Sequence, residues 1–374
     1  MNQNISLGLA RIHAEPGERR DFLPRFIGKL NNRGVKVVLE HGYGGGMGYL
    51  EDDYKKAAPN CSFASSEEVY QQDLVLVLRY PGKALLEKMR PGTCLISMIH
   101  YPTRPERVEH LRSLGLEAIS LDSIQDDIGR RLVENLRAVA WNGVEAAFSV
   151  LRMIYPDPGF GSPNRPPIRV TLLGSGAVGS HVVQAAIRYG NQKLWQRMAR
   201  ANIPGVHANV VDYDLTNHEA YMLDLLRQTD LLIDATQRLD ASQPVIPNLW
   251  IGSMPEHAVL LDLSVDPYQC ESQPMIVKGI EGIPHGNLDK YIFTPDASAY
   301  DEIPTCIDTT HRRYAVSCYS WPGIRPKMCM NHYGKQILPM LRRIIDKAGP
   351  GNLNPEGTFF ERALTRAQLS RWKI

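Results

Sequence analysis

An apolar segment, a glycine-rich turn and a helical pattern follow one another directly between residues 168 and 188. The turn reads Gly-Ser-Gly-Ala-Val-Gly at positions 174–179, and Val182, Val183 and Ala186 form an apolar face behind it. In such a turn the first glycine permits a tight bend, the second lets backbone amides approach a phosphate, and the third lets helix and strand pack closely. The helix N-terminus adds a partial positive charge. A bare GxGxxG motif is weak evidence, but this strand–turn–helix context predicts a dinucleotide-binding site.

An acidic residue follows the next apolar run. The cofactor-binding residues predicted from the turn itself are Gly174, Gly176, Ala177, Val178 and Gly179. Asp212 follows the run 209–211, farther from the turn than the usual distance of about 20 residues, and an insertion at 193–206 accounts for the excess. A strand-end acid accepts hydrogen bonds from both ribose hydroxyls and repels a 2′-phosphate, so Asp212 favours NAD over NADP. Asp214 is the alternative ribose ligand, and a turn acid without a ligand is the other interpretation of Asp212.

Strand-like and helix-like segments alternate along most of the chain. In the first hundred residues, strand-like apolar runs lie at 6–10, 35–39, 74–78 and 94–99, and helical patterns lie at 22–33 and 82–89. A second alternating series starts at Ile168 and continues through the apolar runs 209–211, 231–233 and 259–263. This alternation is typical of open parallel sheets covered by helices on both faces. The sequence therefore predicts an α/β fold with two Rossmann-like, doubly wound domains.

A long helical pattern at 127–154 separates the two series, and it ends in a loop rich in proline and glycine at 155–163. After Asp301 the alternation is lost, and a last helical pattern covers 332–347. We expect the long helices to join the two domains and to leave a cleft between them. The expected divisions are a substrate domain at 1–137, an NAD-binding domain at 138–315, and a C-terminal helical segment at 316–374 that returns to the first domain.

The composition argues against several classes of function. The chain has 42 Lys and Arg against 40 Asp and Glu, so nothing indicates a nucleic acid or an anionic membrane as a partner. No apolar run approaches the roughly 20 residues that span a bilayer, and the first residues lack the basic start of a signal peptide. The six cysteines form no CxxC pair. We therefore expect buried, reduced thiols, no metal site and a cytoplasmic protein.

The order of these features resembles one superfamily, which contains alanine dehydrogenase, the first domain of proton-translocating transhydrogenase, and saccharopine dehydrogenase. The resemblance covers residues 7–349. The stretch 11–24 is similar to the acidic, arginine-containing opening segment of that family. Placing Glu18-x-Arg20 on the family's E-x-R implies that Arg20 binds the substrate carboxylate, and Arg19 is the alternative.

Two positions after buried strands of the first series resemble functional positions of the family. The family carries a lysine two residues before a proline, and Arg79 occupies that place here, in Arg79-Tyr80-Pro81. Arginine can clamp a carboxylate with two parallel hydrogen bonds, but its pKa is too high for it to carry a proton. His100 follows the run 94–99 as the family's catalytic histidine follows its own strand. Although a single histidine at a strand end is more often structural, this order implies that His100 transfers the proton.

Three positions of the second series resemble cofactor-contacting positions of the family. Asp266 falls where the family has an aspartate beside the nicotinamide ribose and the active site, but Pro267-Tyr268-Gln269 replaces the usual glycine pair. Thr236 ends the strand-like run that the family places against the cofactor. Trp321 occupies the place of a late segment near the nicotinamide, and a core aromatic is the alternative interpretation of this residue.

The resemblance implies an NAD-dependent oxidoreductase that acts on the CH–NH bond of an amino acid, or, in reverse, reductively aminates a 2-oxo acid. Arg20 and Arg79 would hold the substrate carboxylate. His100 would handle the proton, and Asp266 would aid orientation and charge. His100, Asp266 and Arg79 are the expected catalytic residues. NAD would carry the hydride. We expect an alanine dehydrogenase-like homo-oligomer with a small-molecule substrate.

Two alternatives remain open from the sequence. A saccharopine- or opine-type dehydrogenase would join an amino acid to a 2-oxo acid and make a secondary amine. A catalytically inactive dinucleotide-binding module would bind the cofactor without chemistry. The presence of Arg20, His100 and Asp266 together argues against the inactive module.

Overall fold

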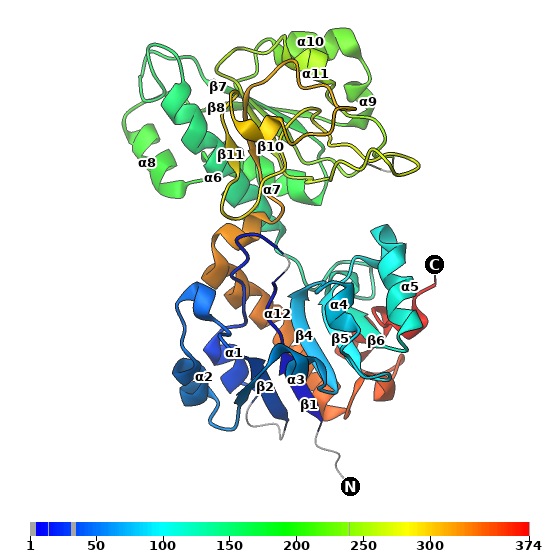
Figure 1. Cartoon of the computed structure of the whole chain (residues 1–374). Coiled ribbons are helices and arrows are strands. Elements are labelled where there is room, and N and C mark those ends of the chain that lie inside the picture. The colour runs from blue at the N-terminus through cyan, green and yellow to red at the C-terminus, as the bar shows by residue number, and fades with distance from the viewer. Residues whose placement is uncertain (1–4, 14, 31–34, 239, 374) are drawn as a thin grey trace. The chain divides into compact units, whose positions relative to one another are not determined.

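The computed structural model describes residues 5–13, 15–30, 35–238 and 240–373. The chain divides into two compact units (Figure 1): unit 1 comprises Met1–Asn135 and Arg325–Ile374, and unit 2 comprises Leu136–Ile324. Each unit contains a six-stranded sheet with helices packed against it. The predicted fold class, two doubly wound α/β domains of Rossmann type, is confirmed.

The sheet of unit 1 is parallel throughout and has the strand order β3-β2-β1-β4-β5-β6. The strands are β1 (Ser6–Leu9), β2 (Lys36–Glu40), β3 (Ser62–Ala64), β4 (Leu74–Arg79), β5 (Cys94–Met98) and β6 (Glu117–Ser120). The helices are α1 (Pro24–Gly28), α2 (Glu51–Ala57), α3 (Ser66–Tyr70), α4 (Lys83–Leu86), α5 (Pro105–Ser113), α12 (Pro326–Asp346) and α13 (Phe359–Arg366). Short 3₁₀ turns are η2 (Gly45–Met47), η3 (Tyr101–Thr103), η4 (Leu121–Ser123), η7 (Pro350–Asn352) and η8 (Leu369–Arg371).

Both faces of this sheet are buried. Along β4, Leu74, Leu76 and Leu78 belong to one core cluster, whereas Val75 and Val77 belong to another on the opposite face. Successive side chains of a strand point to opposite faces, so a strand that is covered on both sides reads as a continuous apolar run. This is why the strand could be recognised by its composition.

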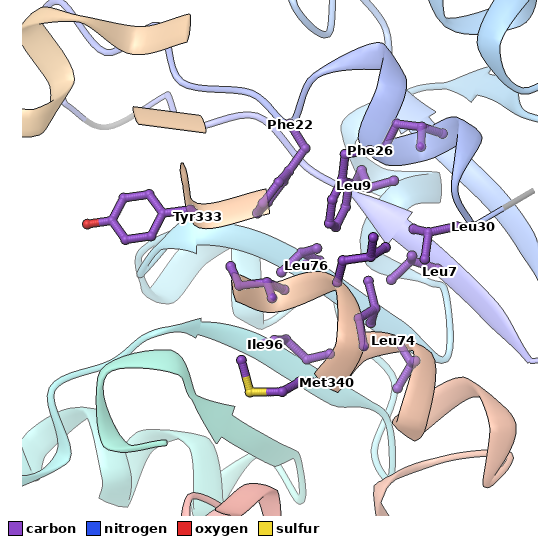
Figure 2. Packing of buried hydrophobic residues seen from close by; sticks show 14 of the residues in the cluster. Leu7, Leu9, Phe22, Phe26, Leu30, Leu74, Leu76, Ile96, Tyr333 and Met340 are labelled. Atoms are coloured by element: carbon purple, nitrogen blue, oxygen red, sulfur yellow. The ribbon is translucent and has the colours of Figure 1, made fainter. Parts of the chain in front are cut away.

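Helix α12 brings the C-terminal part of the chain into the core of unit 1. Figure 2 shows its Met340 beside Ile96 of β5, and both residues are buried in the same cluster. Gly334 lets this helix approach α1 closely, because a Cβ atom there would lie 3.3 Å from the ring of Phe26. Residues separated by some three hundred positions therefore share one core.

The sheet of unit 2 has the order β11-β12-β10-β9-β7-β8, parallel except for the edge strand β11. The strands are β7 (Ile168–Leu173), β8 (Val206–Val211), β9 (Leu231–Asp234), β10 (Val259–Asp262), β11 (Ile292–Phe293) and β12 (Tyr314–Ser317). The helices are α6 (Leu136–Ile154), α7 (Ala177–Ala186), α8 (Gln192–Arg200), α9 (Tyr213–Thr216), α10 (Glu219–Leu226) and α11 (Asn248–Ile251), with 3₁₀ turns η5 (Ser298–Tyr300) and η6 (Trp321–Ile324). Helices α6 and α7 pack on one face of the sheet, and α10 and α11 pack on the other.

The predicted helix at 127–154 is wrong in its first part, because α6 begins at Leu136. The side chain of Asp126 instead accepts hydrogen bonds from the backbone N–H groups of Ile128 and Arg130. An aspartate that binds its own neighbouring backbone offers the chain a turn in place of a helix. The apolar periodicity of the sequence does not reveal that this turn competes with the first turns of the predicted helix.

Other helix boundaries also differ from the predictions. The helix predicted at 22–33 is α1, which covers only residues 24–28, and positions 31–34 lie outside the described residues. Its start is set by Pro24 in the first turn. The helix predicted at 82–89 is the single turn α4, and the one predicted at 332–347 begins earlier, at Pro326.

The prediction that all cysteines are reduced is wrong for two of them. Cys270 and Cys306 form a disulfide with Cα atoms 6.8 Å apart. They come from loops 36 positions apart in the chain, and tertiary folding alone brings them together. Cys61, Cys94, Cys318 and Cys329 are buried thiols that are not disulfide-bonded.

None of the helices in the described ranges combines the length and apolarity needed to span a membrane. The same residues contain no group of three or more His, Cys, Asp or Glu side chains arranged to hold a metal ion.

A buried carboxylate makes the stability of unit 1 depend on pH. Asp21 accepts a hydrogen bond from the backbone N–H of Gly44 at 2.7 Å. Burial raises the pKa of Asp21 to about 7, and the nearby carboxylates of Glu18 and Glu40 act in the same direction, against the opposing effects of Gly44 and Arg11. The folded protein therefore holds this proton more tightly than the unfolded chain does.

We predict that the stability of the folded protein decreases as pH rises from about 4 to above 7, because a raised folded-state pKa stabilises only while the group is protonated. Asp21→Asn keeps an acceptor for Gly44 but cannot ionise, so the difference in urea midpoint between pH 5 and pH 8 should shrink. An equal pH difference in both proteins would contradict the assignment.

Candidate functional site

The glycine-rich turn lies at the carboxyl end of β7 in unit 2 and opens α7. Gly174 has a φ of 88°, and its missing Cβ would lie 3.0 Å from the carbonyl oxygen of Ala235 and 3.1 Å from Cα of Thr236. Gly179 packs against the turn, because a Cβ there would lie 2.2 Å from the Gly174 carbonyl oxygen. A Cβ on Gly176 would meet no heavy atom within 4 Å. The turn is therefore tightly packed at its first and last glycines and open at its middle one.

Asp212 is linked to this turn. Ser175 Oγ donates a hydrogen bond to Asp212 Oδ2 at 2.6 Å, and the backbone N–H of Tyr213 donates to Oδ1 at 2.8 Å. These two hydrogen bonds lower the pKa of Asp212 and keep it ionised. The alternative ribose acid, Asp214, lies in the first turn of α9.

A buried ion pair stands at the carboxyl edge of the same sheet. Lys278 Nζ lies 2.7 Å from Asp262 Oδ2, and their side chains are 0% and 1% exposed. Ser317 Oγ donates to the same carboxylate. Burial alone raises the pKa of Asp262, but Lys278 and these hydrogen bonds lower it overall. Asp262 therefore stays charged within the protein interior.

The neighbouring strand end carries a second buried carboxylate. Asp234 pairs in register with Asp262, and it accepts hydrogen bonds from Ser264 Oγ and from the N–H and hydroxyl of Thr236. Burial and the charge of Asp262 raise the pKa of Asp234. These contacts fix Thr236 against the glycine turn.

Asp266 and Arg238 form an ion pair with a distance of 2.7 Å between Oδ2 and Nη2. The arginine also donates to the backbone carbonyl of Val277. Val265 precedes Asp266 with a φ of 59°, an unfavourable conformation for a β-branched residue, so the loop is held by its surroundings. Nothing in the sequence signals Arg238, because its partner lies in a different loop.

Trp321, expected near the cofactor, is a core residue. Its side chain is 1% exposed, and Nε1 donates to the Asp262 carbonyl oxygen at 2.9 Å. Gly143 of α6 makes room for the ring, since a Cβ there would lie 3.4 Å from two of its atoms. The structure thus supports the alternative interpretation of a core aromatic.

In unit 1, the two predicted carboxylate-binding arginines are each paired with an acid. Arg20 Nη2 lies 2.5 Å from Glu18 Oε2, and these side chains are 2% and 1% exposed. Burial raises the pKa of Glu18, but its hydrogen bonds with Arg20 and the charge of Arg79 lower it overall. Arg79 Nη2 lies 2.8 Å from Glu15 Oε1, and its side chain is 28% exposed. Arg79 is therefore the more accessible of the two.

His100 follows β5 at the carboxyl edge of the sheet of unit 1, where Arg79 ends the neighbouring strand β4. It has a partner that the sequence alone does not reveal. Its Nδ1 lies 3.3 Å from Asp122 Oδ2, and its backbone N–H donates to Oδ1 of the same carboxylate. The His100 side chain is 47% exposed, whereas Asp122 is 7% exposed and also accepts from Ser120 Oγ. Burial raises the pKa of Asp122, but the contacts with His100 and Ser120 lower it overall. The signal that could have found Asp122 is its place after β6, the strand beside β5.

The two sheets and the open glycine turn define a two-domain protein of Rossmann type. Residues 13–140 match the family model "Alanine dehydrogenase/PNT, N-terminal domain". Alanine dehydrogenase of Bacillus subtilis strain 168 is 23% identical over 259 residues, which are 65% of this chain and 66% of that protein. Alanine dehydrogenase of Mycolicibacterium smegmatis is 23% identical over 262 residues, 67% of this chain and 70% of that protein.

Solved structures show the same fold over nearly the whole chain. An L-alanine dehydrogenase has a TM-score of 0.71 at 18% identity, covering 97% of this chain and 94% of that one. Transhydrogenase from Sinorhizobium meliloti has a TM-score of 0.60 at 16% identity, covering 91% and 94%. The chain is thus similar in sequence to alanine dehydrogenases and similar in fold to alanine dehydrogenase and transhydrogenase, which agrees with the resemblance seen in the sequence. The sequence matches span about two thirds of the length of these alanine dehydrogenases.

The different packing of the turn glycines can be tested by stability alone. We expect Gly179→Ala to lower the free energy of unfolding by about 1–3 kcal/mol or more, since the new Cβ overlaps the Gly174 carbonyl oxygen. Gly176→Ala should change it by less than about 1 kcal/mol, because that position is open and has a φ of −65°. Urea denaturation measures both, and similar losses would show that the turn is packed differently.

Proposed function

We propose that this protein is an NAD-dependent amino-acid oxidoreductase of the alanine dehydrogenase type, acting on CH–NH bonds. The observation that carries the proposal is the His100–Asp122 pair, at a strand edge that also presents Arg79, in a chain whose other unit contains the open glycine turn. The relatives named alanine dehydrogenase support the same reaction class.

The residues of unit 2 fit a dinucleotide. The open backbone at Gly176 and the N-terminal amides of α7, at Ala177 and Val178, would bind the pyrophosphate. Asp212, kept ionised by Ser175, would accept hydrogen bonds from the ribose hydroxyls. When bound, NAD supplies the acceptor for the hydride.

His100 is the proposed proton carrier. With Asp122 as the acceptor, Nδ1 carries the hydrogen, and Nε2 keeps the lone pair that takes up a proton. The exposed imidazole can thus deprotonate an attacking water or protonate a leaving amine. Arg79 cannot share this work, since a guanidinium does not deprotonate in a protein.

The substrate carboxylate would bind to the arginines of unit 1. Arg79 is exposed enough for direct contact, and its fork suits a carboxylate. Arg20, buried against Glu18, would add its positive charge to the substrate site and would stabilise the residues around Arg79. Asp266 would contribute charge and orientation beside the cofactor, with its own carboxylate held by Arg238.

The amine decides between a primary and a secondary amino-acid product. Ammonia as the amine defines an alanine dehydrogenase-like enzyme, and an amino acid as the amine defines a saccharopine- or opine-type enzyme. NADH oxidation measured over a panel of 2-oxo acids, each with ammonia and with several amino acids, tests the proposal. Lack of oxidation with every pair, in a folded protein that binds NADH, would favour the inactive dinucleotide-binding module.

We predict a preference for NADH over NADPH in kcat/KM, because the ionised Asp212 repels a 2′-phosphate. Asp212→Ala should reduce the ratio of the two kcat/KM values by about tenfold or more, corresponding to about 1.4 kcal/mol of discrimination. Asp214→Ala is the matched control in the next helix and should leave the ratio unchanged. Equal use of NADPH by the unaltered protein would overturn the assignment of Asp212.

We predict that His100→Ala lowers kcat by roughly 10²- to 10⁴-fold, the usual contribution of general acid–base catalysis. The affinity for NADH, measured by fluorescence titration, should not change, since His100 lies in unit 1. Asp122→Asn should lower kcat less, because the imidazole remains but loses its anionic partner.

His13 provides a control matched in environment. It is also 47% exposed and pairs with a 7% exposed acid, Glu40, at the end of β2. His13→Ala should therefore leave kcat within a few fold. An equal loss of kcat in the two alanine variants would indicate a structural effect and remove His100 from the catalytic role.

A further inference from the structure

Arg107 of α5 reaches the strand edge that carries the proposed chemistry. Its Nη1 donates to the backbone carbonyl of Ile99, the residue before His100, at 3.3 Å. Its guanidinium lies over the ring of Tyr80, 4.4 Å from the centroid, and Tyr80 directly follows Arg79. Strands β4 and β5 pair at this point, with Arg79 opposite Met98. Arg107 thus contacts the backbone just after β5 and the Tyr80 ring just after β4, the two strands that carry the proposed site.

The charge of Arg107 is not neutralised by an ion pair. Within the described ranges of the chain, neither Arg107 nor its neighbour Arg104 has a carboxylate oxygen within 4.0 Å of its guanidinium nitrogens. Glu106 adds attraction from a distance, but partial burial and the like charges of Arg104 and Arg79 lower the pKa of Arg107 overall. By contrast, Arg79 is paired with Glu15. An anion that binds beside a partly buried cation among like charges therefore stabilises it.

The geometry of Arg107 suits a carboxylate. A guanidinium has five N–H donors in one plane, and the Ile99 carbonyl accepts from one of its nitrogens. The contacts with the Tyr80 ring and the Ile99 carbonyl restrict the guanidinium, which reduces the entropy lost when a ligand binds. The remaining donors can make the two parallel hydrogen bonds that a carboxylate accepts.

We propose that Arg107 binds a second carboxylate of the substrate, so that the enzyme acts on dicarboxylic partners in preference to monocarboxylic ones. This inference rests on the proposed function, in which Arg79 takes the first carboxylate beside His100. The second carboxylate belongs either to the side chain of the 2-oxo acid or to the side chain of an acidic amino acid that serves as the amine.

Steady-state kinetics with the full chain and NADH separates these two sources. One arm compares oxaloacetate and 2-oxoglutarate with pyruvate and 2-oxobutyrate, all with ammonia. The other arm uses pyruvate with glutamate, alanine or ammonia. We expect kcat/KM at least about tenfold higher with a dicarboxylic partner in one arm, and the arm that shows it identifies the source.

Arg107→Met keeps an unbranched side chain over Tyr80 and removes the charge. We expect it to raise KM for the dicarboxylic partner by about 10- to 100-fold, as for a lost charge-assisted hydrogen-bond pair, and to change values for monocarboxylic partners by less than about threefold. Arg112→Met, on the same helix but hydrogen-bonded to the Trp372 carbonyl, is the control and should change neither.

Calorimetric binding of glutarate and butyrate, without turnover, distinguishes the two proposals. Tighter binding of glutarate that is lost in Arg107→Met supports the second-carboxylate site, even if no 2-oxo acid is reduced and the proposed function fails. Equal affinities for the two acids in the unaltered protein, or a preference that survives Arg107→Met, would overturn the inference. So would turnover that favours monocarboxylic partners and is insensitive to Arg107→Met.

Discussion

The buried ion pair between Lys278 and Asp262 organises the carboxyl edge of the second sheet. The carboxylate also binds Ser317 of β12 and the backbone N–H of Val265, and the Asp262 carbonyl accepts from Trp321. One strand end thereby connects two strands, the loop toward Asp266 and the turn that packs on α6. Removing one partner of such a pair typically costs about 3–5 kcal/mol, because it leaves a buried charge uncompensated. The open glycine turn lies at the same edge, so its surroundings depend on this pair.

At the carboxyl edge of the sheet of unit 1, the charged side chains form ion pairs that are more exposed than the Lys278–Asp262 pair, with the exception of Arg20 and Glu18. Three of the charged groups at this edge have partners: Arg20 with Glu18, Arg79 with Glu15, and Asp122 with His100. Each pair orders a side chain before any ligand arrives, which lowers the entropy cost of binding. Arg107 has an aromatic contact and a backbone contact, but none of the described residues pairs an acid with it. The contrast between paired and unpaired cations is the physical basis for assigning a ligand to it.

Elements buried on both faces or carrying a rigid turn could be predicted from the sequence. The strands could be predicted because a parallel strand covered by helices on both faces must be apolar along its length. The turn could be predicted because each of its glycines satisfies a separate steric demand. The helix predicted from residue 127 failed because Asp126 closes a turn with its own side chain. His100 could be picked out as a residue, but its partner Asp122 could not, since their contact requires β5 and β6 to lie side by side.

The sequence by itself determined the α/β class, the alternation of strands and helices, and the glycine turn followed by an acid, because these depend on local sterics and on burial along one segment. Only the tertiary structure decided which charges meet. It placed Trp321 in the core, joined Cys270 to Cys306, and, among the residues that the structure describes, gave Arg107 no acid as an ion-pair partner. Such contacts join residues far apart in the chain, and their energies depend on distance and burial, which no local pattern contains.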